Sequence, residues 1–472
     1  MAGPLSAALK SGGGKDLIKE LNKRLAPAVG KYSDFIAEKA EGSYVWTTDG
    51  QKHLDMACGI GVASTGHCHP KVVKAIQDQA SDFIIAQQNV FTSSPAMVGL
   101  LDRLTRIVPK GLDTHVFANS GSEVVENAIK MARAHTKKTN IIAFDGAFHG
   151  RTMGAMAVTS SKTFYRTGFA PLMPQVFIAP YPYCLHCKVR QIAPDGKDWY
   201  KMTPSIPPFD EFEARQCCRG PHDALKWMLK MQSAPEDTAA IIIEPILGEG
   251  GFVAPPPDFL STLRKHCDEH NIVMIVDEVQ SGVARTGKWW AHEHFKGVVP
   301  DIMLFAKGIA SGFPFAGIAA KPKMYEGLPT GSLGGTYGGS ILGCAAANAT
   351  IDAIEEDGML QNATERGVQL VKGLLEMSKR YPIIDVRGRG LMVAVEFGEQ
   401  RGVDGSYTAK PGCATAVTKA AQRRNMILLT AGARECIRFL PPLNVKASEI
   451  DEALEKLEGS LQEVFSNDKK TS

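Results

Sequence analysis

Short runs of consecutive apolar residues recur through the middle of the chain, and a polar residue ends each of them. The runs with their polar ends are 141–144 with Asp145, 239–243 with Glu244, 272–276 with Asp277, and 302–306 with Lys307. Strands that are apolar at every position are buried on both faces, so these runs predict an α/β fold with a mainly parallel sheet covered by helices. Ligands of such sheets bind at the carboxyl ends of the strands. We therefore expect Glu244, Asp277 and Lys307 at one edge of the sheet.

The alternation of strands and helices is interrupted twice. Residues 180–231 are rich in proline and poor in apolar runs, which predicts a long surface insertion, such as a lid or a subunit contact. Beyond residue 343 the pattern predicts helices at 345–356 and 365–380, a strand–turn–strand unit at 383–397 and a last helix at 448–464. These later elements indicate a small C-terminal domain.

Charge and hydropathy exclude several classes of partner. The chain has 53 basic and 50 acidic residues, a net charge of +3, whereas nucleic acid and anionic membranes both demand a concentrated basic face. No apolar run approaches the roughly 18 residues that a membrane-spanning helix needs. The first residues lack the apolar segment of a secretory signal. We expect a cytoplasmic protein, with a weak mitochondrial presequence as the alternative because no acidic residue precedes Asp16.

Four of the ten cysteines are grouped. Cys184 and Cys187 form a C-x-x-C pair, and Cys217 and Cys218 are adjacent about thirty residues later. A zinc or iron–sulfur site is one interpretation, because C-x-x-C has the spacing of a metal chelate. Structural or incidental thiols are favoured, since a zinc ribbon would repeat the C-x-x-C pair. We therefore expect no metal.

Asp277 and Lys307 are the strongest pair of chemical residues. Each follows a buried strand, and thirty residues, enough for one crossover, separate them. A lysine at the edge of a parallel sheet fits a Schiff-base nucleophile, and a carboxylate that keeps a heteroaromatic nitrogen protonated would complement it. Taken singly, Lys307 could be a solvated lysine and Asp277 a helix cap.

A second motif predicts a phosphate site. Ser120, Gly121 and Ser122 follow a strand and open a helix expected at 124–135, where free N–H groups and the helix dipole favour an anion. Phe148, just after the next strand, offers an aromatic face. The alternatives are a plain helix cap and a core phenylalanine.

Together these motifs resemble the class III pyridoxal-phosphate-dependent aminotransferases, over a stretch from about residue 31 to the last helix. The matching segments are Asn119-Ser120-Gly121-Ser122-Glu123, Asp277-Glu278-Val279-Gln280-Ser281-Gly282, Phe305-Ala306-Lys307-Gly308, Thr65-Gly66-His67-Cys68-His69-Pro70, residues 244–251 and residues 334–339. The resemblance implies the type I fold, with a seven-stranded sheet in a large domain at 71–343. It also implies a small α/β domain made of segments 1–70 and 344–472.

The resemblance assigns cofactor roles. Lys307 is expected to bond pyridoxal 5'-phosphate as a Schiff base and to carry the proton, while Asp277 pairs with the pyridine nitrogen. The other expected cofactor contacts are Ser120, Gly121, Ser122, Phe148, Glu244, Val279 and Gln280, with Thr336 contributed by the second subunit of a homodimer.

Four further positions bear on the substrates. Arg151 lies where the 4-aminobutyrate enzymes of this family bind the donor carboxylate, and Glu249 and Arg438 match their pair that masks and frees an arginine for 2-oxoglutarate. Ile60 lies where ornithine enzymes carry tyrosine. Alternatively, Arg151 and Arg438 could be structural ion-pair residues.

The resemblance therefore implies ping-pong transfer of an amino group from an ω-amino acid, foremost 4-aminobutyrate, to a 2-oxo acid acceptor. The alternatives are an ornithine or acetylornithine aminotransferase, a racemase of the same fold, or a non-catalytic cofactor-binding scaffold.

Overall fold

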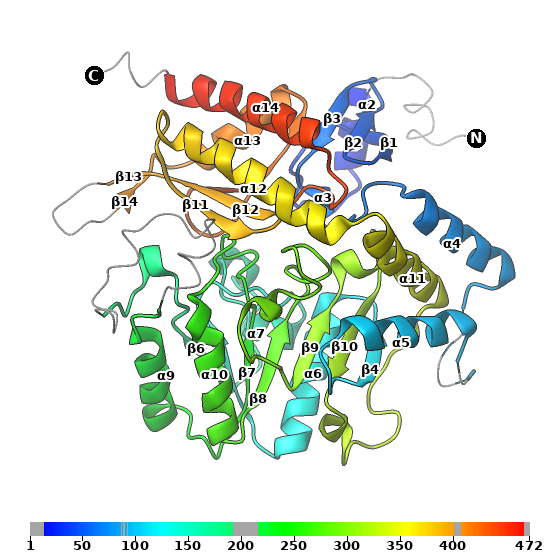
Figure 1. The fold of residues 1–472 in the computed structure, drawn as a ribbon, viewed down its shortest axis with the longest axis vertical. Helices are drawn as coiled ribbons and strands as arrows, with labels where there is room; N and C mark the ends of the chain where they lie inside the picture. Colours follow the sequence, from blue (N-terminus) through cyan, green and yellow to red (C-terminus); the bar gives the residue numbers. More distant parts are fainter. Residues whose placement is uncertain are drawn as a thin grey trace.

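A seven-stranded sheet forms the centre of the larger part of the molecule (Figure 1). The computed structural model describes residues 14–466 except 86, 88–89, 92, 192–215 and 401–406. The strand order is β4-β10-β9-β8-β7-β5-β6. Strands β6, β5, β7, β8 and β9 are parallel, and β10 runs antiparallel to both its neighbours, so the predicted mainly parallel sheet of seven strands is confirmed. The bounds are β4 Thr114–Ala118, β5 Asn140–Phe144, β6 Val176–Ala179, β7 Thr238–Ile243, β8 Val273–Asp277, β9 Ile302–Phe305 and β10 Ala316–Ala320.

Alternate residues of these strands face two separate apolar layers. Ile242 and Ile275 pack in the layer that contains α6 (Gly121–Thr136). Ile241 and Met274 pack in the opposite layer, with α9 (Gly220–Met231) and α10 (Pro257–Glu269). Figure 1 shows α9 and α10 side by side along one side of the sheet. Burial on both faces explains why the strands are apolar at every position.

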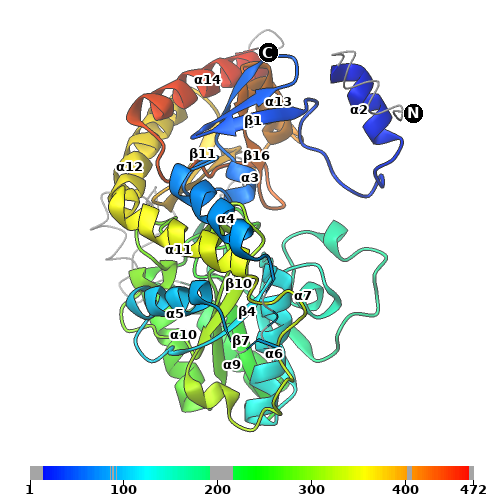
Figure 2. The same ribbon diagram turned by 90° about the vertical axis from the view of Figure 1, so that its right-hand side faces the viewer.

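The smaller part of the molecule joins the two ends of the chain (Figure 2). One sheet has the order β1-β2-β3-β15, in which β15 pairs with β3 in parallel, and the other has the order β11-β12-β17-β16. The strands are β1 Ala37–Glu41, β2 Tyr44–Thr47, β3 Lys52–Asp55, β11 Ile383–Arg389, β12 Met392–Phe397, β15 Met426–Ile427, β16 Leu429–Thr430 and β17 Cys436–Phe439. The same part of the molecule contains three helices, α12 (Met359–Ser378), α13 (Cys413–Arg423) and α14 (Ala447–Phe465).

Helix α11 (Ile341–Glu356) packs against two further helices, α4 (Pro70–Asp82) and α5 (Pro95–Ile107). The domain limits at residues 70 and 343 stay a prediction, and α11 spans the second of them. The remaining elements are α2 Gly14–Asn22, α3 Cys58–Gly61, α7 Met153–Ala157, β13 Glu399–Gln400, β14 Tyr407–Thr408 and five short 3-10 turns, Thr163–Tyr165, Cys184–His186, Ala291–His294, Lys307–Ala310 and Pro322–Tyr325. Within the described ranges no helix has the length and apolarity to cross a membrane.

The structure differs from the sequence interpretation in two places. The expected insertion at 180–231 ends earlier, because its last twelve residues form α9, whose Leu225 and Leu229 pack on the sheet; the middle of the insertion lies outside the described residues. Helix α12 begins at Met359 rather than at 365, since Met359 and Ala363 extend its buried face toward the N-terminus.

Candidate active site

Three charged residues follow three neighbouring strands at the same edge of the central sheet. Glu244 follows β7 directly, Asp277 is the last residue of β8, and Lys307 lies two residues beyond β9. All three line one cavity of about 330 Å³, a size typical of a cofactor or small-molecule site. The structure thus brings together the residues that the strand pattern placed at one edge.

The N-terminus of α6 opens onto the same cavity. Ser120, Gly121 and Ser122 all line it. The Ser120 hydroxyl accepts the N–H of Glu123 at 3.4 Å, and the Glu123 carboxylate accepts the N–H of Asn119 at 2.7 Å, so the helix start is capped from both sides. The free N–H groups of the first turn and the helix dipole favour an anion at this end of the cavity.

The carboxylate of Asp277 has a buried partner, His149, that the sequence motifs did not assign to the site. His149 Nδ1 lies 2.7 Å from Asp277 Oδ2, and both side chains are buried. Because a carboxylate only accepts hydrogen bonds, His149 donates from Nδ1. The N–H of Val279 donates to the other oxygen at 3.0 Å. These two donors fix the orientation of the Asp277 carboxylate in the cavity wall.

Lys307 occupies a backbone conformation that is rare for residues other than glycine. Its φ is +46°, in the left-handed region, and strain of this kind costs about 1–3 kcal/mol and concentrates at functional sites. Burial lowers the pKa of the Lys307 amine; the nearby Glu249 opposes this shift and Arg438 reinforces it. A lowered pKa enlarges the neutral fraction of the amine, which is the nucleophilic form.

Glu249 and Arg438 form a buried ion pair beside the cavity. Glu249 lines the cavity, whereas Arg438, on β17 in the smaller part of the molecule, contacts Glu249 but is not itself among the lining residues. Gln280 Nε2 also donates to Glu249 Oε1, at 3.3 Å. Burial alone would raise the pKa of the Glu249 carboxyl, but the Arg438 charge outweighs it and the pKa is lowered. The pair is therefore charged on both sides, and any second anion that binds Arg438 must compete with Glu249.

The carboxyl of Glu244, which lines this cavity, has a pKa near neutrality. Burial raises the pKa of its carboxyl to about 7; the His149 ring opposes the rise and Asp277 adds to it. The N–H groups of Phe148 and Gly248 donate to its two oxygens at 2.9 and 2.8 Å. Glu244 therefore has a fixed position, whichever protonation state it takes.

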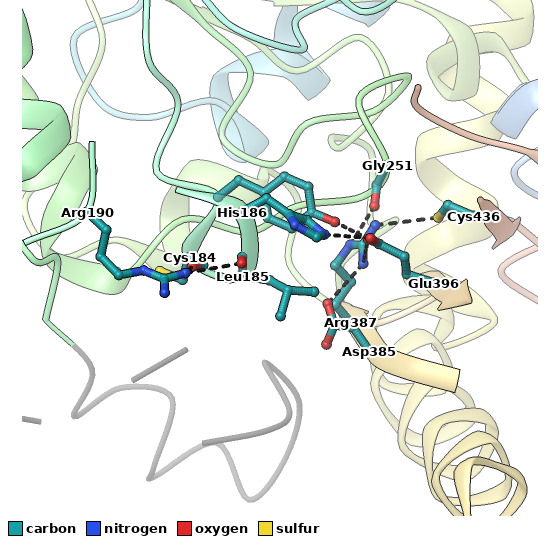
Figure 3. Close-up of polar contacts among 10 residues, drawn as sticks. Cys184, Leu185, His186, Arg190, Gly251, Asp385, Arg387, Glu396 and Cys436 are labelled. Atoms are coloured by element: carbon teal, nitrogen blue, oxygen red, sulfur yellow. Dashed lines mark hydrogen bonds and ion pairs between the residues drawn. The ribbon is translucent and has the colours of Figure 1, made fainter. Parts of the chain in front are cut away.

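A polar network behind the cavity anchors the loop that carries Glu249 (Figure 3). Arg387 Nε donates to the carbonyl of Gly251 at 2.7 Å, and Arg387 Nη1 donates to Asp385 and Glu396 at 2.9 and 2.8 Å. His186 Nε2 lies 2.6 Å from Glu396 Oε1. The network joins the start of the insertion, the Glu249 loop and the β11–β12 hairpin.

Not every predicted site residue lines this cavity. Arg151 lines it and is exposed, as expected for a group that meets an incoming substrate. Thr336 is exposed and Ile60 is partly buried, and neither is among the lining residues. Ile60 has a φ of +68°, a strained value for a β-branched residue, in the turn that leads to the lining residue Val62.

Several lining residues were not predicted. They are Val62, Asn119, His149, Ala306, Gly312, Phe313, Pro314 and Phe315. Lys162 was also missed; burial lowers the pKa of its amine, and it interacts electrostatically with Glu249 and Arg438. His149 adjoins Phe148 in the sequence, so its position next to a predicted contact was the one signal available for it.

The lining fits a flat ring that carries a phosphate. Phe148 and Val279 both line the cavity, and a Cβ atom at Gly121 would lie 3.2 Å from Val279 Cγ1, so the backbone of the anion site approaches the ring wall closely. Gln280 Oε1 is buried and has no hydrogen-bond partner among the described residues. With the Lys307 amine and the Asp277 carboxylate, these groups suit pyridoxal phosphate. In contrast, no three His, Cys, Asp or Glu side chains in the described part gather so as to hold a metal ion.

The fold and this site together define a pyridoxal-phosphate-dependent enzyme of fold type I. A model of the class III aminotransferases matches residues 26–461. A probable 4-aminobutyrate aminotransferase of Bacillus subtilis is 37% identical over 432 residues, which cover 90% of this chain and 93% of the relative. A 5-aminovalerate aminotransferase of Pseudomonas aeruginosa is 36% identical over 93% of this chain and 96% of its own length.

A solved structure agrees with these relatives. The omega-transaminase of Thermomicrobium roseum has a TM-score of 0.82 and 28% identity to this chain, and the match covers 95% of this chain and 98% of that one. The chain belongs to the class III aminotransferase family, and its cofactor is pyridoxal phosphate.

Proposed function

We propose that the protein transfers the amino group of an ω-amino acid, foremost 4-aminobutyrate, to 2-oxoglutarate by a ping-pong mechanism. The observation that carries this proposal is the Glu249–Arg438 ion pair beside the cavity that also holds the Lys307 amine. The two substrates differ by one carboxylate, because 4-aminobutyrate carries one and 2-oxoglutarate carries two. An arginine whose charge a glutamate can neutralise suits an enzyme that must accept both in turn.

Pyridoxal phosphate, when bound, supplies the electron sink that stabilises negative charge on the substrate carbon. The protein's own side chains bind the cofactor and transfer protons. The Lys307 amine, with its lowered pKa, would hold the cofactor, and its Nζ would accept and return the proton of the substrate carbon. Asp277, oriented by His149 and Val279, keeps the ring nitrogen protonated. Ser120, Gly121 and Ser122 bind the phosphate at the start of α6.

Two arginines bind the substrate carboxylates. A guanidinium binds a carboxylate with two parallel hydrogen bonds, which gives position as well as affinity. Arg151 binds the single carboxylate of the ω-amino acid, while Glu249 neutralises Arg438. When 2-oxoglutarate enters, its carboxylate beside the oxo group displaces Glu249 from Arg438, and Arg151 binds the distal carboxylate. The lowered pKa of the Glu249 carboxyl keeps this group ionised while it is paired with Arg438.

The relatives support a donor with a terminal amine. Those compared above carry the names of 4-aminobutyrate and 5-aminovalerate aminotransferases, whose donors differ by one methylene. A single methylene changes transition-state binding by about 1–3 kcal/mol, so one pocket can accept both donors at different rates. We therefore expect 4-aminobutyrate to react fastest and 5-aminovalerate to follow.

A donor panel tests the assignment. The holoenzyme is given 4-aminobutyrate, 5-aminovalerate, ornithine or acetylornithine with 2-oxoglutarate, and glutamate formation is measured. A further arm measures loss of optical activity from single amino acids without an oxo acid, which tests for a racemase. A higher kcat/KM with ornithine or acetylornithine than with 4-aminobutyrate, or racemisation without transfer, would contradict the proposal.

We also propose that the enzyme acts as a homodimer. Thr336 lies in an exposed segment and does not line the cavity of its own chain. A phosphate contact from Thr336 therefore requires a second copy, whose cavity it completes.

A further inference from the structure

Three cysteine thiols meet at the base of the insertion. The thiols of Cys187 and Cys217 both donate hydrogen bonds to the sulfur of Cys218. Cys187 precedes the residues outside the described ranges and Cys218 follows them, so this contact joins the two ends of the insertion. Neither the proposed reaction nor the cofactor site uses any of the three.

The surrounding backbone holds the two ends of the insertion together. A Cβ atom at Gly220 would fall 1.7 Å from the carbonyl oxygen of Val189, so the chain after Cys187 runs directly against the start of α9. Backbone N–H groups of Gln191 and Gly220 donate to the Cys218 sulfur. Main-chain packing therefore holds together the two segments that carry Cys187 and Cys218.

The segment before Cys187 is anchored as well (Figure 3). Arg190 Nη2 donates to the carbonyls of Cys184 and Leu185 at 2.7 and 3.1 Å, which closes the turn that carries Cys187. His186, the residue next to Cys187, contacts the buried Glu396 at 2.6 Å. A disulfide forms most readily where the backbone is already in place, and these contacts fix the segment that carries Cys187.

Cys218 has the environment of a reactive thiol. The hydrogen bonds from Cys187 and Cys217 lower the pKa of the Cys218 thiol, and burial opposes them only in part. Cys218 also lies two residues before α9, whose N-terminal dipole favours a thiolate. Both Cys218 and Cys187 are partly exposed, whereas Cys217 is buried. Of the three, Cys187 and Cys218 are therefore the residues that solvent can approach.

We propose that Cys187 and Cys218 are a peroxide-sensitive thiol pair that oxidises to a disulfide across the base of the insertion. The Cys218 thiolate attacks hydrogen peroxide, the O–O bond breaks, and Cys218 becomes a sulfenic acid while hydroxide leaves. The Cys187 sulfur then attacks the Cys218 sulfur, the S–O bond breaks, and water leaves. In sum, two thiols lose two electrons and two protons, and one peroxide becomes two waters.

The test is peptide mapping of the oxidised holoenzyme. Folded protein is treated with hydrogen peroxide, remaining thiols are alkylated, and non-reduced digests are sequenced by mass spectrometry. We expect a Cys187–Cys218 linked peptide, lighter by two hydrogen atoms, that disappears on treatment with dithiothreitol. It should be lost in Cys187→Ser and Cys218→Ser and retained in Cys217→Ser. The exposed Cys68 is the matched control, and Cys68→Ser should also retain the link.

Three results would overturn the proposal. They are absence of any linkage in the oxidised wild-type protein, linkage of Cys217 to Cys218 or of Cys184 to Cys187 instead, and stoichiometric zinc in the purified protein that Cys218→Ser removes. The wild-type map is decisive even if a variant does not fold, and it does not depend on which amino donor the enzyme uses.

Discussion

Lys307 carries the chemistry at the scale of a single residue. Replacing Lys307 with alanine removes the amine that holds the cofactor and moves the proton, so we expect transfer from 4-aminobutyrate to 2-oxoglutarate to fall by about 10³-fold or more. Steady-state glutamate formation measures the loss. Lys307→Arg is the matched control, since it keeps a positive charge but not a nucleophilic amine. Activity in either variant near that of the wild type would exclude the proposed role.

Gly150 shows how closely the backbone approaches the candidate phosphate site. Its φ is +136°, and a Cβ atom there would lie 2.3 Å from Ser122 Oγ and 2.9 Å from Ala155 Cβ. Gly150→Ala therefore combines backbone strain with overpacking. We expect it to lower the free energy of unfolding by about 1–3 kcal/mol more than backbone strain alone would. It should also displace the Ser122 hydroxyl and weaken cofactor binding, which equilibrium dialysis and the unfolding midpoint measure.

Gly168→Ala separates the two effects. Gly168 also has a positive φ, +84°, but nothing lies within 4 Å of its Cβ position. We expect Gly168→Ala to lose stability from strain only and to keep its cofactor affinity. Equal losses in the two variants would show that the contact with Ser122 is unimportant.

At the scale of elements, Glu396 on β12 joins the hairpin to the start of the insertion. Arg387, His186 and Tyr183 all donate to its carboxylate. Burial would raise the pKa of Glu396, but Arg387 and the other donors lower it from 4.5 to about 2. The pKa of Glu396 is therefore lower in the folded state than in the unfolded state. The stabilisation of the fold by the ionised Glu396 carboxylate is complete above pH 4.5 and is lost as the pH falls toward 2. It amounts to roughly 3 kcal/mol.

Glu396→Gln should therefore flatten the acid dependence of stability. It should also lower stability at pH 7 by about 3–5 kcal/mol, because Arg387 loses a buried partner. Unfolding midpoints of wild type and variant at pH 7 and pH 3 measure both effects. Glu376, exposed on α12 and paired with Lys379, is the control position. If the midpoint of Glu396→Gln still falls by as much as that of the wild type between pH 7 and pH 3, the Glu396 assignment is wrong.

At the scale of the whole molecule, the proposed homodimer predicts complementation between two inactive variants. Lys307→Ala and Thr336→Asp should each be inactive alone, the second because a carboxylate repels the cofactor phosphate. In a mixed dimer, the chain with intact Lys307 receives an intact Thr336 from its partner. Mixing the unfolded chains and refolding them should restore roughly a quarter of wild-type activity, because half the dimers are mixed and each has one complete site.

Two measurements decide this prediction. Light scattering should give a mass near twice 50.9 kDa. No recovered activity in refolded mixtures that do contain mixed dimers would place Thr336 in the site of its own chain, or outside the site altogether.

Local pattern was sufficient for the central sheet and for part of the site. Apolar runs bounded by polar residues located β5, β7, β8 and β9, because strands buried on both faces must be apolar at each position. The carboxyl ends of parallel strands share one edge, and this rule alone brought Glu244, Asp277 and Lys307 together. The end of the insertion was misplaced, because the proline-rich composition of its first part hid the helical spacing of α9.

By itself, the sequence determined the fold class and the family and located Glu244, Asp277 and Lys307 at the cavity, since each of these depends on short motifs and on one general rule of sheet geometry. Only the tertiary structure showed that His149 pairs with Asp277, which lies 128 residues further along the chain. The family resemblance had already paired Arg438 with Glu249, 189 residues apart, and the structure shows the contact between them. The thiols of Cys187 and Cys218 likewise come from opposite ends of an insertion. Such contacts depend on how whole elements pack, because a side chain reaches only a few ångströms and local spacing carries no information about distant partners.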